Sequence, residues 1–119
     1  ISPDRYVKKE KERIKKIDDV INQYDQIIIY GAGMLGKIMH GILMEGRRNI
    51  KVKYFAVSDL EGNPDDLYGV PVRQIDELLR YKENALVIIS VGKKNTQEIE
   101  HHLKSIGFVH YVLMKDIDN

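Results

Sequence analysis

A glycine-rich turn lies between a short apolar segment and an amphipathic one, close to the start of the chain. The apolar segment covers residues 26–30 and includes three consecutive isoleucines, and the turn has the spacing Gly31-x-Gly33-x-x-Gly36. A β-branched run that stops at glycine predicts a strand buried on both faces, which is typical of the centre of a parallel sheet. After the turn, apolar residues recur at helical spacing until Gly46, which predicts the end of that helix. The sequence therefore predicts a strand, a tight turn and a helix in direct succession.

The rest of the chain repeats this alternation of strands and helices. Apolar patterns and turn residues predict further strands at 52–57, 70–72, 85–91 and 109–114, and helices at 3–23, 75–79 and 95–106. The first helix has Ser2 as its N-cap and Pro3 at its first position. Helix-length spacers between strands predict a parallel sheet with helices on both faces. We expect residues 1–25 to form an extra N-terminal amphipathic helix, and residues 26–119 to form a three-layer α/β/α domain with five strands in the order 3-2-1-4-5.

Each glycine of the turn has a separate mechanical role. Gly31 allows the tight turn, Gly33 leaves space for a phosphate close to the backbone, and Gly36 lets the helix pack closely on the strand. The first amides of the helix then point toward the anion, and the helix dipole strengthens the attraction. Because the pattern follows a strand and opens a helix, it predicts a Rossmann-type fold. The expected contacts include the three residues between the glycines, which are Ala32, Met34 and Leu35.

An acidic residue ends the second predicted strand. Asp59 stands 28 residues after Gly31, and a carboxylate at this place in the fold accepts hydrogen bonds from ribose hydroxyls. No arginine follows at Leu60 or Glu61, so a 2′-phosphate would meet acid rather than base. If a dinucleotide binds, the sequence favours NAD over NADP. The alternative is that Asp59 only caps a turn.

The loop after the fourth predicted strand forms the opposite wall of the expected site. Ligands of open α/β sheets bind at the carboxyl ends of the strands, so Ser90, Gly92 and Lys93 are candidate contacts. Lys93 or Asn95 would reach a phosphate or a sugar. The alternative is that the lysines are solvated and that Asn95 only caps its own helix, where Asn95 and Glu98 resemble a capping box.

Composition and residue spacing exclude several classes of site. Nineteen basic and 18 acidic residues leave a net charge of +1, so we expect no nucleic-acid partner. The absence of cysteine excludes disulfides, thiolate nucleophiles and iron–sulfur clusters, and we expect a cytoplasmic location with no membrane span. His101 and His102 are adjacent on a helix and diverge, and we expect His40 to face solvent or a partner. Tyr111 and Lys115 fall on a predicted strand, not on the helix that a dehydrogenase pair needs. We expect no catalytic residues and no metal.

Four motifs together resemble a known group of domains. They are IIIYGAGMLGK at 27–37, FAVSD at 55–59, YGVPV at 68–72 and LVIISVG at 86–92. In this order they resemble the small Rossmann-like domains of bacterial surface-polysaccharide biosynthesis proteins. Such domains precede the catalytic regions of nucleotide-sugar dehydratases and of sugar acetyltransferases, and others are appended to glycosyltransferases. The resemblance implies that the glycine turn and Asp59 line a pocket for a UDP-sugar, although the family usually has two or three acids after the second strand.

The sequence leaves three functional hypotheses. The first is a nucleotide-sugar or dinucleotide-binding module that is not catalytic by itself and belongs to a larger sugar-modifying enzyme or glycosyltransferase. Its ligand would be a UDP-sugar or NAD, and its partner an attached catalytic domain or a second copy of the chain. The second hypothesis is the NAD-binding fragment of an oxidoreductase. The third is an interaction domain that kept the fold and binds no nucleotide.

Overall fold

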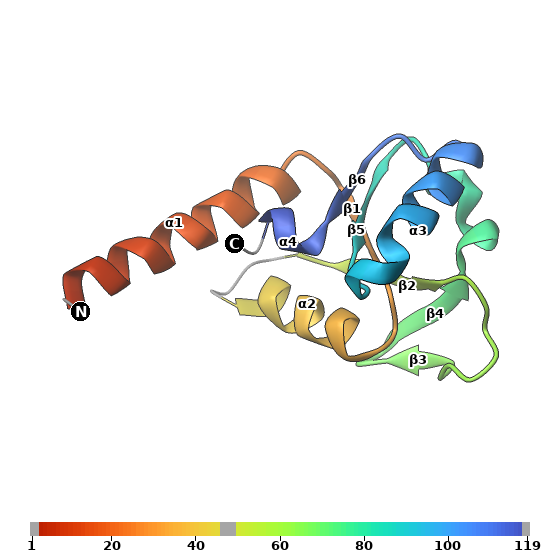
Figure 1. Cartoon of the computed structure of the whole chain (residues 1–119), viewed down its shortest axis with the longest axis horizontal. Helices are drawn as coiled ribbons and strands as arrows, with labels where there is room; N and C mark the ends of the chain where they lie inside the picture. Colours follow the sequence, from red (N-terminus) through yellow and green to blue (C-terminus); the bar gives the residue numbers. More distant parts are fainter. Residues whose placement is uncertain (1–2, 46–49, 118–119) are drawn as a thin grey trace.

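The computed structural model describes residues 3–45 and 50–117, and its elements alternate as the sequence predicts (Figure 1). The helices are α1 (Pro3–Ile21), α2 (Met34–Met44), the 3₁₀-helix η2 (Ile75–Tyr81), α3 (Lys93–Ser105) and α4 (Met114–Ile117). The strands are β1 (Gln26–Tyr30), β2 (Val52–Val57), β3 (Asp66–Leu67), β4 (Val70–Gln74), β5 (Ala85–Ile89) and β6 (Tyr111–Leu113).

A single sheet of six strands runs in the order β3-β4-β2-β1-β5-β6. The five predicted strands are all present, parallel and in the predicted order. The sixth strand, β3, lies at the edge and pairs antiparallel with β4, opposite Pro71. None of the strands predicted from the sequence includes Asp66–Leu67. Because proline has no amide hydrogen, its position in this short outer hairpin fits its chemistry.

Both faces of the sheet are covered, which confirms the three-layer architecture. Ile27 and Ile29 pack in a core with α1, α2 and α4, whereas Ile28 and Tyr30 pack in a second core with η2 and α3. All four side chains are at most 2% exposed. The apolar run of β1 therefore lies at the centre of the sheet, as its sequence indicated.

Several predicted element boundaries are wrong. Helix α3 begins at Lys93 with Gly92 as its N-cap, so Asn95 lies in the first turn and does not cap the helix. The last strand stops at Leu113, where α4 begins. Tyr111 is therefore on a strand, as expected, but Lys115 lies on a helix. The predicted caps Ser2 and Gly46 lie outside the described residues.

Helix α1 packs on the domain through its second half (Figure 1). Ile17 and Ile21 are at most 3% exposed, whereas Val7 is 48% exposed. The first half of the helix extends beyond the sheet, which lengthens the molecule to 46 Å along its longest axis. An ion pair of 2.9 Å between Arg13 and Glu45 links α1 to the end of α2.

The hairpin of β3 and β4 contacts α2 through the ring of Tyr68. Its turn places Tyr68 at φ 55° and Gly69 at φ 79°, a geometry that suits Asn or Gly better than Tyr. The Tyr68 ring stacks on His40 at 4.7 Å between centroids, and His40 lies 5.8 Å from buried Phe55. His40, expected to face solvent or a partner, is instead partly buried.

Burial lowers the pKa of His40 from its ordinary value of 6.5, which makes folding dependent on pH. As the pH decreases, the unfolded chain takes up this proton before the folded chain does. The stability that neutral His40 contributes is therefore fully present above about pH 6.5 and is lost as the pH decreases toward the folded pKa. We expect His40→Gln to lose less stability than the wild type between pH 8 and pH 5.5, measured by urea unfolding. An equal loss in both proteins would contradict this assignment.

Candidate functional site

The glycine turn is fixed between the carboxyl ends of β2 and β5. Gly31 has φ 122°, and its amide donates to the carbonyl of Ala56 at 2.8 Å. On the other side, the amide of Ser90 donates to the carbonyl of Tyr30 at 2.8 Å. A Cβ atom on Gly31 would lie 2.5 Å from the carbonyl oxygen of Ser90. The position therefore excludes every other residue both by its φ angle and by space.

Gly36 brings helix α2 into direct contact with this turn. A Cβ atom at Gly36 would lie 1.9 Å from the carbonyl oxygen of Gly31, which is far inside van der Waals contact. Both groups belong to the backbone, so no side-chain rotation relieves the overlap. The packing role that the sequence assigned to Gly36 agrees with this geometry.

Gly33 differs from the other two glycines because the space around it is open. It is the N-cap of α2 and has no side-chain cap hydrogen bond, and a Cβ atom there would meet nothing within 4 Å. The first amides of a helix have no partners within the helix, and the helix dipole adds partial positive charge. The start of α2 therefore offers a free approach to an anion. Next to it, Ala32 is only 8% exposed, whereas Met34 is 77% exposed.

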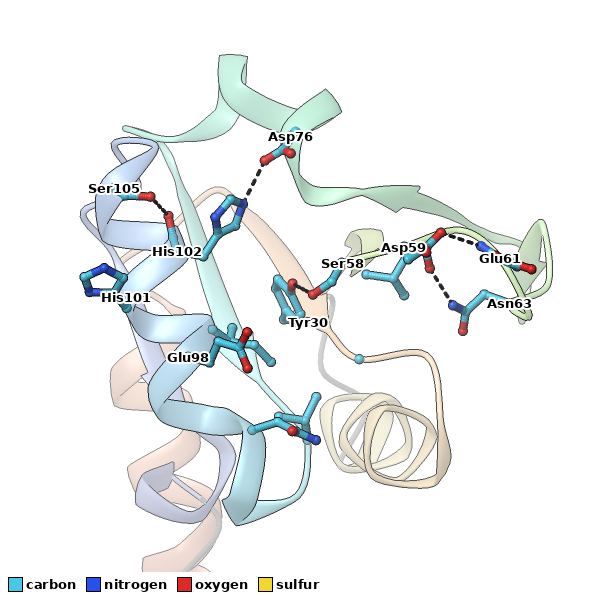
Figure 2. Close-up of a pocket in the computed structure, with 15 residues that line it drawn as sticks. Tyr30, Ser58, Asp59, Glu61, Asn63, Asp76, Glu98, His101, His102 and Ser105 are labelled. Atoms are coloured by element: carbon cyan, nitrogen blue, oxygen red, sulfur yellow. Dashed lines mark hydrogen bonds and ion pairs between the residues drawn. The ribbon is translucent and has the colours of Figure 1, made fainter.

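A cavity of about 810 Å³ opens beside this turn, between the ends of β1 and β2 and the elements η2 and α3 (Figure 2). Of the predicted site residues, Gly31 and Asp59 line it. Asn95, for which the sequence leaves a ligand contact and a helix cap as alternatives, lines it as well. The remaining lining residues are Tyr30, Val57, Ser58, Glu61, Asn63, Asp76, Val91, Glu98, Ile99, His101, His102 and Ser105.

Three predicted contacts on the opposite wall lie elsewhere. Ser90 is 2% exposed, and its hydroxyl donates to the carbonyl of Ile88 at 3.2 Å. Gly92 is the exposed N-cap of α3. Lys93 lines a second cavity of about 360 Å³, together with Leu35 and the ends of β5 and β6. The structure therefore separates these residues from Asp59, although Val91 borders both cavities.

Asp59 shapes the loop that follows β2. Its Oδ1 accepts the amide of Glu61 at 2.9 Å, and its carbonyl accepts the side chain of Asn63 at 2.8 Å (Figure 2). The turn-capping alternative is thus present. A carboxylate has two acceptor oxygens, so the hydrogen bond from Glu61 does not prevent Asp59 from accepting another hydrogen bond from a ligand in the cavity.

Polar groups that the sequence analysis did not single out form the floor and one wall of the cavity. At the floor, the hydroxyl of Tyr30 is hydrogen-bonded to that of Ser58, and burial raises the pKa of Tyr30 above its ordinary value. At the wall, His102 Nε2 lies 2.9 Å from Asp76 Oδ1 and so joins α3 to η2. Tyr30 is the last residue of a buried apolar strand, and a buried tyrosine hydroxyl needs a hydrogen-bond partner, which was the sequence signal for a polar group at this place.

The cavity lining is acidic. It includes the carboxylates of Asp59, Glu61, Asp76 and Glu98, and no lysine or arginine of the described chain lines it. Residues 3–45 and 50–117 also include no group of three side chains that would hold a metal ion. Among the described helices, none has the length and apolar character that a membrane span needs. The carboxylates of this cavity could accept hydrogen bonds from hydroxyl or amino groups.

Comparison with known proteins supports the architecture. No protein-family model matches the sequence, and a search of curated proteins finds no match. Among solved structures, UDP-D-quinovosamine 4-dehydrogenase from Vibrio fischeri is similar with a TM-score of 0.59 and 18% identity, over 79% of this chain and 83% of that one. The fold is Rossmann-like. A Rex-family repressor is similar with a TM-score of 0.56 and 17% identity, over 78% of this chain and 54% of the repressor.

Proposed function

We propose that this domain binds a nucleoside diphosphate compound across the carboxyl edge of its sheet. The open space at Gly33, beside a cavity that Asp59 lines, is the observation that carries the proposal. The diphosphate would accept hydrogen bonds from the first amides of α2, as anions do at helix N-termini. The ribose hydroxyls would then donate to the carboxylate of Asp59.

The acidic lining favours a ribose without an added phosphate. A 2′-phosphate would lie close to Asp59 and Glu61, and like charges at such short range repel strongly. Of the dinucleotides we therefore favour NAD over NADP. A nucleotide-sugar meets the same requirement, because its ribose also carries free hydroxyls.

We further propose that the domain holds its nucleotide while another part of a bacterial surface-polysaccharide biosynthesis protein performs the chemistry. The resemblance of four sequence motifs supports this role. Similarity to a protein described as a UDP-D-quinovosamine 4-dehydrogenase supports a sugar nucleotide as ligand. The second candidate, an NAD-binding fragment of an oxidoreductase, is favoured by the same glycine turn and by Asp59.

Thermal unfolding against a panel of UMP, UDP, UDP-sugars, NAD, NADH and NADP tests the proposal. A ligand at 100 times its dissociation constant adds about 2.7 kcal/mol of stability, which raises the Tm of a domain this size by ~10 °C. A shift with UDP compounds supports the sugar-nucleotide module, whereas a shift with NAD or NADH alone supports the oxidoreductase fragment. NADP is expected to raise the Tm less than NAD at the same concentration. The absence of any shift would refute nucleotide binding and favour an interaction domain.

A further inference from the structure

Helix α2 is apolar on the face that it turns away from the sheet. Its inner face packs in the core through Met39, Ile42 and Leu43. Its outer face exposes Met34 by 77%, Ile38 by 45% and Met44 by 41%. Large apolar side chains that are exposed together on one face of a protein mark interaction surfaces. In Figure 1, α2 belongs to an outer layer of the fold.

The outer face is arranged symmetrically about Gly41. Ile38 and Met44 stand three residues before and after this glycine, and Lys37 and Glu45 stand four residues before and after it. At 3.6 residues per turn, all four positions fall on the same side of the helix as Gly41. A two-fold axis beside Gly41 and perpendicular to the helix would therefore place Ile38 at the same level as Met44, and Lys37 at the same level as Glu45, of a second helix. This arrangement is complementary to itself in both apolar character and charge.

Gly41 also allows a second helix to come close. It is exposed, and a Cβ atom built on it would meet nothing within 4 Å. Glycine inside a helix weakens it relative to alanine. At the centre of an exposed helix face, a glycine lets the backbone of a second helix approach closely, because it has no side chain.

We propose that a second copy of this chain packs antiparallel on the outer face of α2, with the two-fold axis at Gly41. The Lys37 ammonium of each copy would then join the ion pair that Glu45 of the other copy forms with its own Arg13. The Glu45 side chain is 48% exposed and accepts from Arg13 at 2.9 Å, and a carboxylate accepts from several donors. The centre of this contact at Gly41 lies eight residues from Gly33, which is about 12 Å along the helix.

A contact built on one eleven-residue helix is small, so the dimer belongs to the weak class of interfaces. Sedimentation of the full chain between about 10 µM and 1 mM covers the range expected for such an interface. We expect the wild type to associate reversibly in this range. A protein that stays monomeric up to 1 mM would overturn the proposal.

Charge reversal provides the specific test. Lys37→Glu and Glu45→Lys each place like charges opposite one another in a homodimer, so each alone is expected to weaken association at least tenfold. An equimolar mixture of the two variants places opposite charges at both contacts, and association is expected to return. This return also shows that both variants are folded. Failure of the mixture to associate would overturn the antiparallel arrangement.

Two matched controls separate this surface from general effects of charge. Lys94→Glu reverses an exposed lysine at the start of α3 and is expected to leave association unchanged. Ile38→Glu is expected to abolish association, whereas Leu79→Glu, at a leucine that is 41% exposed on η2, is expected to preserve it. Loss of association in the Leu79 or Lys94 variants, or its survival in the Ile38 variant, would place the contact elsewhere.

Discussion

Gly36→Ala is expected to destabilise the domain by ~3 kcal/mol or more, although it adds a single methyl group. The added carbon would lie 1.9 Å from the carbonyl oxygen of Gly31, so α2 has to move away from the turn. That movement separates Met39 and Leu43 from the core, where both side chains are fully buried. The Tm of the variant should fall by ~10 °C or more, measured by circular dichroism or calorimetry.

Gly41→Ala is the matched control because it makes the same change in the same helix. A Cβ atom at Gly41 meets nothing within 4 Å, and alanine favours a helix over glycine by about 1 kcal/mol. Measured at low concentration, where the chain is monomeric, this variant should be slightly more stable than the wild type. If both variants unfold at the wild-type temperature, α2 does not pack on the glycine turn as described.

Gly33→Asp is expected to abolish nucleotide binding while the domain remains folded. The position is an N-cap in extended backbone conformation with open space around it, and aspartate is among the preferred N-cap residues. Its carboxylate would accept the hydrogen bonds that the first amides of α2 would otherwise donate to the phosphate, and its charge would repel the phosphate. At an effective dielectric of 20, like charges 4 Å apart cost about 4 kcal/mol. Affinity for the best ligand of the thermal panel should therefore fall at least ~100-fold, measured by calorimetric titration.

Gly33→Asn separates charge from volume in this experiment. Asparagine caps a helix about as well as aspartate and has nearly the same shape, but it carries no charge. We expect its affinity to lie between those of the wild type and the aspartate variant, with both variants at least as stable as the wild type. Wild-type affinity in Gly33→Asp would exclude the N-terminus of α2 as the phosphate site.

The five parallel strands were predictable because each of them carries its own local signal, and their order followed from right-handed crossovers. The isoleucines of β1 and the apolar run of β5 are too short for helices and too apolar for an edge strand, which puts both at the centre of the sheet. The roles of Gly31 and Gly36 followed from the turn spacing alone. Strand β3 was not predictable in this way, since its two residues are too few for a pattern and its turn has Tyr68 in an αL conformation that is unusual for tyrosine.

The candidate site was only half predictable. Gly31 and Asp59 come from sequence positions with fixed places in the fold, so their shared cavity was expected. The pair of Asp76 and His102 joins η2 to α3, and no local pattern indicates which side chains of two separate elements will meet. The error at α3 has a local cause. Asn95 and Glu98 have the spacing of a capping box, but the backbone at Gly92 already turns into the helix.

The central place of β1 affects how the chain comes to be folded. Its two neighbours are β2 and β5, and Ile29 pairs with Phe55 on one side and with Ile88 on the other. Closing such distant pairs costs loop entropy before any contact is gained, so parallel sheets form slowly. During synthesis β1 is made well before β5. Until β5 is made, the backbone groups on one side of β1 stay unpaired and are open to pairing with another chain. The strand at the centre of the finished sheet is therefore also a segment at risk of aggregation while the chain is being made.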